Sequence, residues 1–124
     1  MMPLRLVMMG TGEFALPTFE TLYATPYPVV GLFTQPDRIA PGRKVQHANP
    51  LKDLALARGT PVLQPPSVNA PEGLASLRAL NPDVLVVAAY GQILSPELLA
   101  IPRVAAINVH ASLLPRHQIG RAHV

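Results

Sequence analysis

The sequence contains no cysteine and no long hydrophobic run, and each absence excludes a class of protein. Without cysteine, the chain cannot be a disulfide-stabilised secreted domain or build a thiolate metal site. Its apolar runs are short and interrupted by proline, so no membrane-spanning segment is predicted. The first residues lack a basic lead, a long apolar stretch and a small-residue cleavage site, which argues against a secretion signal. The expected location is therefore the cytoplasm.

Charged residues are also few, at 14% of the chain, whereas hydrophobic residues make up 49%. This balance is typical of a folded protein with an apolar interior and not of a disordered chain. A length of 124 residues allows at most one domain. It lies near the lower limit for a sheet that is covered by helices on both faces.

The charges are unevenly distributed along the chain. Residues 38–58 contain five basic residues and one acid, so this segment has a net charge of +4, whereas the rest of the chain sums to −1. Its basic residues are Arg38, Arg43, Lys44, Lys52 and Arg58. Such a local concentration predicts a phosphate-rich partner, and the alternative is a solvated, flexible loop.

Apolar and amphipathic stretches alternate along the chain. Strands are predicted over residues 4–9, 29–33, 61–63, 83–89 and 105–110. Helices are predicted over residues 13–23, 51–58, 71–80 and 95–100. This alternation predicts an α/β fold of Rossmann-like type, an open and mostly parallel sheet with helices on both faces, and we expect it to be incomplete at its C-terminal side.

Asn108 and His110 follow the apolar run Val104–Ile107, which predicts a buried parallel strand. Residues two apart in a strand project from the same face, about 6.6 Å apart. The carboxyl ends of such strands are where open α/β sheets bind ligands, so we predict a functional pair over a merely structural one. A metal site is not predicted, because no further histidine or carboxylate lies at ligand spacing.

Residues 10–15 read G-T-G-E-F-A and match the dinucleotide fingerprint between a strand and a helix. That fingerprint also needs an acid at the end of the second strand, but Phe33-Thr34-Gln35-Pro36 stands there and Asp37 lies beyond the proline. A tight strand-to-helix turn is therefore favoured over nicotinamide binding. The loop over residues 88–94 is either an ordinary connection or a lining for a flat aromatic ligand.

Five motifs together resemble the methionyl-tRNA formyltransferase family, and the likeness runs from residue 4 to 116. They are M-G-T-x-E-F-A (9–15), F-T-Q-P-D-R (33–38), N-P-D (81–83), A-Y-G (89–91) and I-N-V-H-x-S-L-L-P-R (107–116). N-x-H-x-S-L-L-P alone is shared by the wider group of transferases that use 10-formyltetrahydrofolate. T-Q-P-D-R followed by a basic segment narrows the resemblance to the tRNA-specific branch.

The resemblance implies formyl transfer from 10-formyltetrahydrofolate to the methionyl amino group of initiator methionyl-tRNA, in translation initiation. Asn108 and His110 match the family's catalytic pair, and donors fixed near the developing oxyanion would lower the barrier. Arg43 and Lys44 match its contact with the tRNA acceptor end. The segment that holds the folate in the family is matched here by Ser112, Leu113, Leu114 and Pro115.

The sequence also departs from the family pattern. Gly12 replaces a usual proline, and residues 39–45 read I-A-P-G-R-K-V where the family has P-A-G-R-G-K-K. A third catalytic residue, an aspartate, and a small β-barrel domain lie downstream in the family. The chain by itself is therefore expected to be an inactive fragment of a protein that is monomeric at full length.

Residues 119–124 read I-G-R-A-H-V and continue no earlier pattern. They match the translation of a common sequencing-adapter read. We therefore expect residues 1–118 to form the N-terminal part of a formyltransferase catalytic domain and residues 119–124 to be a non-native tail.

Three alternative functions remain open at this point. One is a formyltransferase acting on a small amine, either glycinamide ribonucleotide or an amino sugar. Another is a dinucleotide-binding oxidoreductase domain, which would bind nicotinamide and not folate. The third is a non-catalytic RNA-binding module, whose affinity would not depend on Asn108 or His110.

Overall fold

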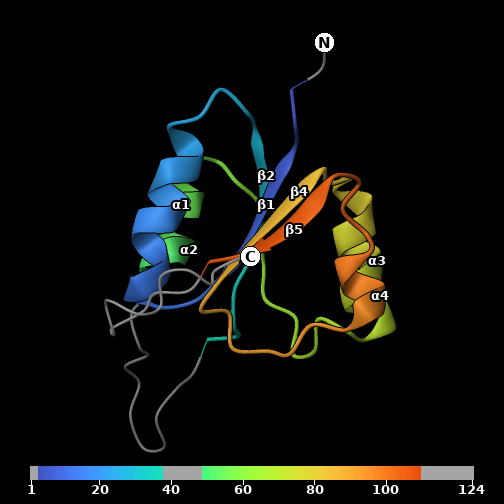
Figure 1. The fold of residues 1–124 in the computed structure, drawn as a ribbon. Coiled ribbons are helices and arrows are strands. Elements are labelled where there is room, and N and C mark those ends of the chain that lie inside the picture. The colour runs from blue at the N-terminus through green and yellow to red at the C-terminus, as the bar shows by residue number, and fades with distance from the viewer. Residues whose placement is uncertain (1–2, 38–48, 110–124) are drawn as a thin grey trace, which may run out of the picture.

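The computed structural model describes residues 3–37 and 49–109, and these form an α/β fold (Figure 1). Its strands are β1 (Leu6–Gly10), β2 (Val29–Phe33), β3 (Val62–Leu63), β4 (Val84–Ala88) and β5 (Ala105–Asn108). Its helices are α1 (Leu16–Tyr23), α2 (Pro50–Ala57), α3 (Pro71–Ala79) and α4 (Pro96–Leu99), with a 3₁₀ turn, η1 (Glu13–Ala15), before α1. The predicted alternation of strands and helices is confirmed.

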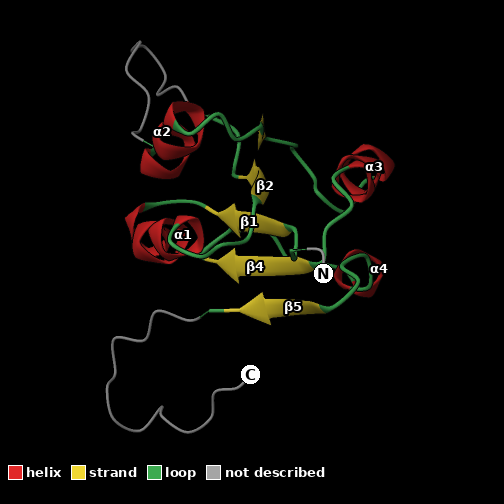
Figure 2. Ribbon diagram, turned by 90° about the horizontal axis from the view of Figure 1, so that it is seen from above, coloured by secondary structure: helices red, strands yellow, loops and turns green. Residues whose placement is uncertain are grey.

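The strands form one parallel sheet in the order β3-β2-β1-β4-β5. The chain first moves outward from β1 to β3 and then returns to the other side of β1 for β4 and β5. Helices α1 and α2 cover one face and α3 and α4 cover the other, as Figure 2 shows. The strand order reverses between β1 and β4, which is where folds of this type place ligands at the carboxyl ends of the strands.

The two faces of β1 anchor two separate apolar cores. Leu6 and Met8 pack on one face with Phe19 of α1, whereas Val7 and Met9 pack on the other. This division follows from the two-residue period of a strand. Every residue of β1 and β4 is buried, which explains why both strands read as continuous apolar runs in the sequence.

The first helix begins later than the sequence predicts. An α-helix was expected from Glu13, but residues 13–15 form a 3₁₀ turn and α1 starts at Leu16. Pro17 has no N–H to donate to the carbonyl of Glu13, and its ring would crowd that oxygen. The N–H of Leu16 bonds to Glu13 instead, closing the tighter turn.

Helix α2 begins one residue earlier than predicted. The side chain of Asn49 accepts a hydrogen bond from the N–H of Lys52 at 3.2 Å and caps the helix. Pro50 occupies the first turn, where its missing N–H costs nothing. The helix ends at Ala57, one residue before the predicted end, and Gly59 lies just beyond it with a positive φ of 75°.

Asp83, from the N-P-D motif, ties three strands together at their amino ends. Its carboxylate accepts hydrogen bonds from the backbone N–H of Arg5 at 2.9 Å and from Nε of Arg103 at 2.8 Å. Its carbonyl accepts from the N–H of Val104 at 2.8 Å. The N–H of Arg5 first, and the guanidinium of Arg103 second, hold the pKa of Asp83 below its usual value. The motif therefore has a structural role in this chain.

Strand β5 departs from the expectation of a buried strand. Among the described strands it pairs with β4 alone, and the side chain of Ile107 is 47% exposed. Val104 and Val109 are also exposed.

None of the helices in the described ranges has the length and apolar character that a membrane crossing requires.

Candidate functional site

The carboxyl ends of the strands bring five segments to the same edge of the sheet, here called the carboxyl edge. They are the turn 10–12 after β1, residues 34–37 after β2, Gln64 after β3, the loop 89–92 after β4, and Asn108 at the end of β5. Hydrogen bonds join the first four of these segments to one another. This edge is the candidate functional site.

The turn 10–12 is the tight connection that the two glycines predict. A Cβ on Gly10 would lie 2.7 Å from the carbonyl oxygen of Ala88, so no larger residue fits between β1 and β4. Gly12 has a φ of 86°, which other residues rarely adopt. The N–H of Thr11 bonds to the carbonyl of Ala89 at 2.9 Å and fixes the turn against the loop 89–92.

The hydroxyl of Thr11 lies at the centre of a polar network. It donates to the carbonyl of Tyr90 at 3.1 Å and accepts from the N–H of Gln35 at 3.1 Å. Because a hydroxyl has one hydrogen, the 3.2 Å contact with Thr34 must have the Thr34 hydroxyl as donor. Thr34 in turn accepts from the side-chain amide of Asn49 at 3.1 Å. Each hydroxyl therefore donates one hydrogen bond and accepts at least one, and that of Thr34 is buried whereas that of Thr11 is half-buried.

Gln35 contacts the segments that follow three other strands. Besides the N–H bond to Thr11, its Nε2 donates to the carbonyl of Gly91 at 3.2 Å. Its Oε1 accepts from Nε2 of Gln92 at 2.8 Å, and its carbonyl accepts from Nε2 of Gln64 at 3.1 Å. One residue thus links the ends of β1, β3 and β4 to the end of β2.

Asp37 forms hydrogen bonds with two neighbouring side chains. Its carboxylate lies 2.7 Å from Nζ of Lys52 on α2 and accepts from Nε2 of Gln64 at 2.9 Å. The hydrogen bond from Lys52, followed by that from Gln64, lowers the pKa of Asp37. Residues 33–36 supply no acid for a ribose, and Asp37 is already paired. Among the described residues, the dinucleotide alternative therefore keeps its glycine turn but lacks an unpaired acid at the end of β2 that could bind a ribose.

The side chain of Tyr90 does not face the carboxyl edge. It is 2% exposed and packs in the core beside α3 with Val7, Leu77 and Leu98. Its hydroxyl has no hydrogen-bond partner among the described residues, and burial raises its pKa to about 12. The loop 89–92 therefore presents its backbone and Gly91 at the edge, and not the tyrosine ring.

Asn108 is the one predicted catalytic residue that the structure describes. It ends β5, pairs with Val87 of β4 and is exposed at the carboxyl edge. The other predicted site residues, His110, Ser112, Leu113, Leu114, Pro115, Arg43 and Lys44, lie outside the described residues. A shared face for Asn108 and His110 thus stays a prediction, as does the tail over residues 119–124.

Of the basic residues in the segment 38–58, the structure describes Lys52 and Arg58, and both have partners. Lys52 pairs with Asp37, and the guanidinium of Arg58 lies 4.6 Å from the ring centre of Tyr23. Within residues 3–37 and 49–109, no group of three or more histidine, aspartate or glutamate side chains is placed to hold a metal ion.

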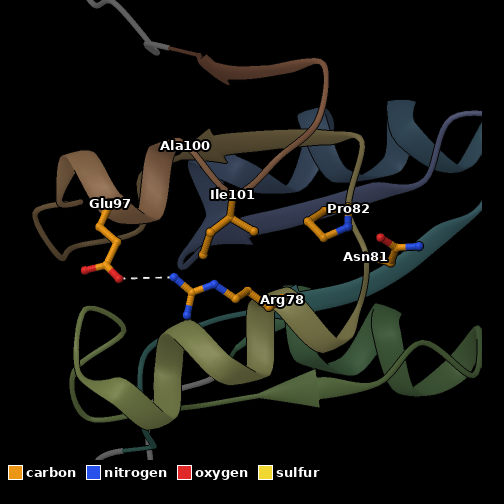
Figure 3. A pocket seen from close by; sticks show the side chains of 6 residues that line it. All are labelled: Arg78, Asn81, Pro82, Glu97, Ala100 and Ile101. Atoms are coloured by element: carbon orange, nitrogen blue, oxygen red, sulfur yellow. Dashed lines mark hydrogen bonds and ion pairs between the residues drawn. The ribbon is translucent and has the colours of Figure 1, made fainter.

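A pocket of about 450 Å³ lies away from the carboxyl edge, between α3 and α4 (Figure 3). It is lined by Arg78, Asn81, Pro82, Glu97, Ala100 and Ile101. Arg78 and Glu97 form an exposed ion pair of 3.1 Å on its wall. Because Asn81 and Pro82 precede β4, the pocket faces the amino ends of the strands, and it shares no residue with the candidate site.

Gln35, Gln92 and Thr34 are site residues that the sequence alone did not predict. Each stands directly at or shortly after the end of a strand, which is the signal that could have identified them. Their contacts depend on which strands are neighbours, and that order becomes visible only in the folded sheet.

This chain is similar in sequence to known proteins. The family model described as "Formyl transferase" matches residues 4–124. A protein named methionyl-tRNA formyltransferase from Trichlorobacter lovleyi is 53% identical over 115 residues, and one of that name from Acidithiobacillus ferrooxidans is 54% identical over 111 residues. These alignments cover 92% and 90% of this chain but 36% of each relative, so the chain spans about a third of their length.

A solved structure shows the same fold. Glycinamide ribonucleotide transformylase 1 from Geobacillus kaustophilus matches with a TM-score of 0.61 and 23% identity, over 94% of this chain and 62% of that chain. At this identity the likeness concerns the fold alone. The family match along nearly the whole sequence shows that the chain belongs to the formyl transferase family.

Proposed function

We propose that this chain is part of an enzyme that transfers a formyl group from 10-formyltetrahydrofolate to the amino group of methionine on initiator tRNA. The observation that carries the proposal is the exposed position of Asn108 at the carboxyl edge of a formyl transferase fold. The relatives named methionyl-tRNA formyltransferase, at 53% and 54% identity, support the tRNA-linked amine as substrate. This substrate also supports the cytoplasm as the place of action.

Asn108 has chemistry that suits this reaction. Attack of the amine on the formyl carbon turns the formyl oxygen into an oxyanion, which hydrogen-bond donors can stabilise. The side-chain amide of Asn108 supplies one donor, and His110, two residues further on, supplies the second. Loss of one such donor typically costs about 3 kcal/mol of transition-state stabilisation. The amine must also lose a proton, which requires a base or a relayed water.

The folate would lie between residues 112–115 and the loop 89–92. This loop follows β4, the strand that pairs with β5, so it flanks Asn108. The structure supports a role for its backbone, because Tyr90 turns its ring into the core. Backbone N–H and C=O groups suit the edge of a flat heterocycle such as a pterin.

The tRNA would be contacted by Arg43 and Lys44. Lys52 and Arg58 are less suited to this role, because one is paired with Asp37 and the other lies against Tyr23. Contacts between basic side chains and phosphates release bound cations, so the proposed tRNA affinity would fall as salt rises.

A hybrid protein tests the proposed function. It consists of residues 1–115 of this chain followed by the downstream part of the Trichlorobacter lovleyi relative. We expect it to formylate methionyl-tRNA, and we expect Asn108→Ala to lower kcat by about 100-fold to 1,000-fold. The readout is formation of formylmethionyl-tRNA under steady-state conditions.

Asn69→Ala is the matched control for this test. The amide of Asn69 bonds to Ile93 and Ser95 and not to β5, so its loss should change kcat by less than about fivefold. Formylation of glycinamide ribonucleotide or an amino sugar in preference to methionyl-tRNA would support a small-amine transferase instead. An Asn108→Ala hybrid with unchanged kcat would contradict the proposed role of Asn108.

A further inference from the structure

We propose that Gln35 is a positioning residue for formyl transfer. It holds the loop 89–92 against the ends of β1, β2 and β3, and through that loop it sets the surroundings of Asn108. The functional part of this inference rests on the function proposed above. The structural part rests on contacts among described residues and can be tested separately.

The side-chain amide of Gln35 is oriented by two different partners. Its Nε2 faces the carbonyl of Gly91, and its Oε1 faces Nε2 of Gln92. A flipped amide would place two NH₂ groups against each other and an oxygen against a carbonyl, so one orientation is satisfied. Gln35 therefore holds two successive residues of the loop 89–92 in a defined geometry.

Gln92 extends this connection to the segment before α3. Its Nε2 also donates to the carbonyl of Pro65 at 3.2 Å, and its Oε1 accepts from the N–H of Val68 at 2.8 Å. The side-chain amide of Gln92 thus connects Gln35 to Pro65 and Val68. Because Val68 does not bond to Gln35 itself, the state of its N–H reports whether Gln35 orders Gln92.

Gly91 shows how closely Gln35 fits the loop. A Cβ at Gly91 would lie 2.7 Å from Nε2 of Gln35, and the residue has a φ of 98°. The φ of 98° disfavours any residue with a side chain here, and Gln35 would also have to move to make room for one.

The expected effect on catalysis follows from the position of the loop beside β5. Val87, near the end of β4, pairs with Asn108, and the loop follows directly after β4. A displacement of reacting groups by about 1 Å can cost about 100-fold in rate. Gln35 would therefore act on kcat through the loop, without contacting the formyl group.

The first experiment measures amide hydrogen exchange in this chain. Gln35→Met keeps the length of the side chain and removes both of its hydrogen-bonding groups. We expect the N–H of Val68 to exchange at least about tenfold faster, whereas Met8 in β1 should be unchanged. Thr25→Val is the control, because it removes hydrogen bonds to Leu22 and Tyr27 at the far end of α1. Unchanged exchange at Val68 would overturn the structural part of the inference.

The second experiment measures kinetics in the hybrid. Gln35→Met should lower kcat by about tenfold to 100-fold while KM for methionyl-tRNA changes by less than about twofold. Gln35 and Gln92 should also act as one unit. The double variant Gln35→Met, Gln92→Met should therefore have a kcat no lower than that of the less active single variant. Losses that multiply, or a raised KM with unchanged kcat, would overturn a positioning role.

The two experiments separate this inference from the proposed function. If the unsubstituted hybrid does not formylate methionyl-tRNA, the proposed function fails, and the catalytic part of the inference fails with it. Exchange at Val68 then still decides whether Gln35 orders the loop. If the hybrid is active and Gln35→Met leaves kcat unchanged, the inference fails while the proposed function stands.

Discussion

At the scale of single residues, the hydroxyls of Thr11 and Thr34 at the carboxyl edge are satisfied and the hydroxyl of Tyr90 is not. The hydroxyl of Thr34 donates to that of Thr11, which donates to the carbonyl of Tyr90, so each hydroxyl has partners. Tyr90 is 2% exposed, and its oxygen lies among apolar side chains without a partner in the described residues. A buried hydroxyl without a hydrogen bond lowers the stability of the folded state, so this oxygen is expected to be destabilising.

Tyr90→Phe should therefore stabilise the chain by about 1 kcal/mol at neutral pH, because it removes the unpaired oxygen and keeps the ring. The pKa of Tyr90 is raised to about 12, above the ordinary value of 10.0. As pH rises above 10.0, the unfolded state loses a proton that the folded state retains, so the stability of the parent chain falls. The advantage of Tyr90→Phe should then grow, which urea unfolding at neutral pH and near pH 10.5 would show.

Tyr23→Phe is the matched control for this prediction. The hydroxyl of Tyr23 bonds to the hydroxyl of Thr60, which is buried. Its removal leaves a buried group with one partner fewer, so the control should be destabilised. A loss of stability in Tyr90→Phe as well would mean that the Tyr90 hydroxyl has a partner in solution.

At the scale of elements, proline and asparagine set where the helices start. Pro17 delays α1, whereas Asn49 and Pro50 start α2 directly. The periodic pattern of apolar residues identified both helices correctly, because burial on one face determines that pattern. It missed the first turns, because these depend on single hydrogen bonds that periodicity does not record.

Asn49 serves both α2 and the carboxyl edge, so its two contacts can be separated by substitution. Asn49→Ala should cost about 1 kcal/mol of stability through loss of the cap on Lys52. Asn49→Asp keeps an oxygen for the cap and adds a charge that favours the helix N-terminus, but it cannot donate to Thr34. It should therefore retain more stability than Asn49→Ala. Urea midpoints of the three proteins provide the measurement, and equal losses would show that the cap contributes little.

At the scale of the whole molecule, the two ends of the sheet have different tasks. The amino ends of β1, β4 and β5 are joined by Asp83, Arg5 and Arg103. The carboxyl ends carry the Gln35 network and Asn108. The Asp83 cluster thus lies at the opposite end of the sheet from Asn108, which agrees with the placement of ligands at the carboxyl ends of open α/β sheets.

Much of this architecture could be predicted from sequence, but the contacts that depend on strand order could not. Alternating apolar strands and amphipathic helices determine the α/β class, and Gly10 and Gly12 indicated the turn after β1. The bonds that Gln35 makes to Gly91 and Gln92 join residues 56 and 57 positions apart. Such contacts require β2 and β4 to flank the same strand, and the local pattern contains no information on that order. Likewise, exposure of β5 depends on its neighbours and not on its own apolar residues.

The Asp83 cluster predicts how the stability of the whole sheet depends on acid. The pKa of Asp83 is lowered from 3.8, so its contribution to stability is present above pH 3.8 and is lost as the pH falls through the lower folded-state value. Asp83→Asn should be less stable at neutral pH, because the amide places an NH₂ group toward donors from Arg5 or Arg103. The variant should also lose less of its remaining stability between pH 5 and pH 3 than the parent.

Asp37 contributes to the acid dependence in the same direction. Some acid sensitivity should therefore persist in Asp83→Asn and decline further when Asp37→Asn is added. Urea unfolding across this pH range measures both effects. A parent and an Asp83→Asn variant with the same acid dependence would show that the carboxylate of Asp83 does not stabilise the amino ends of the sheet through its charge.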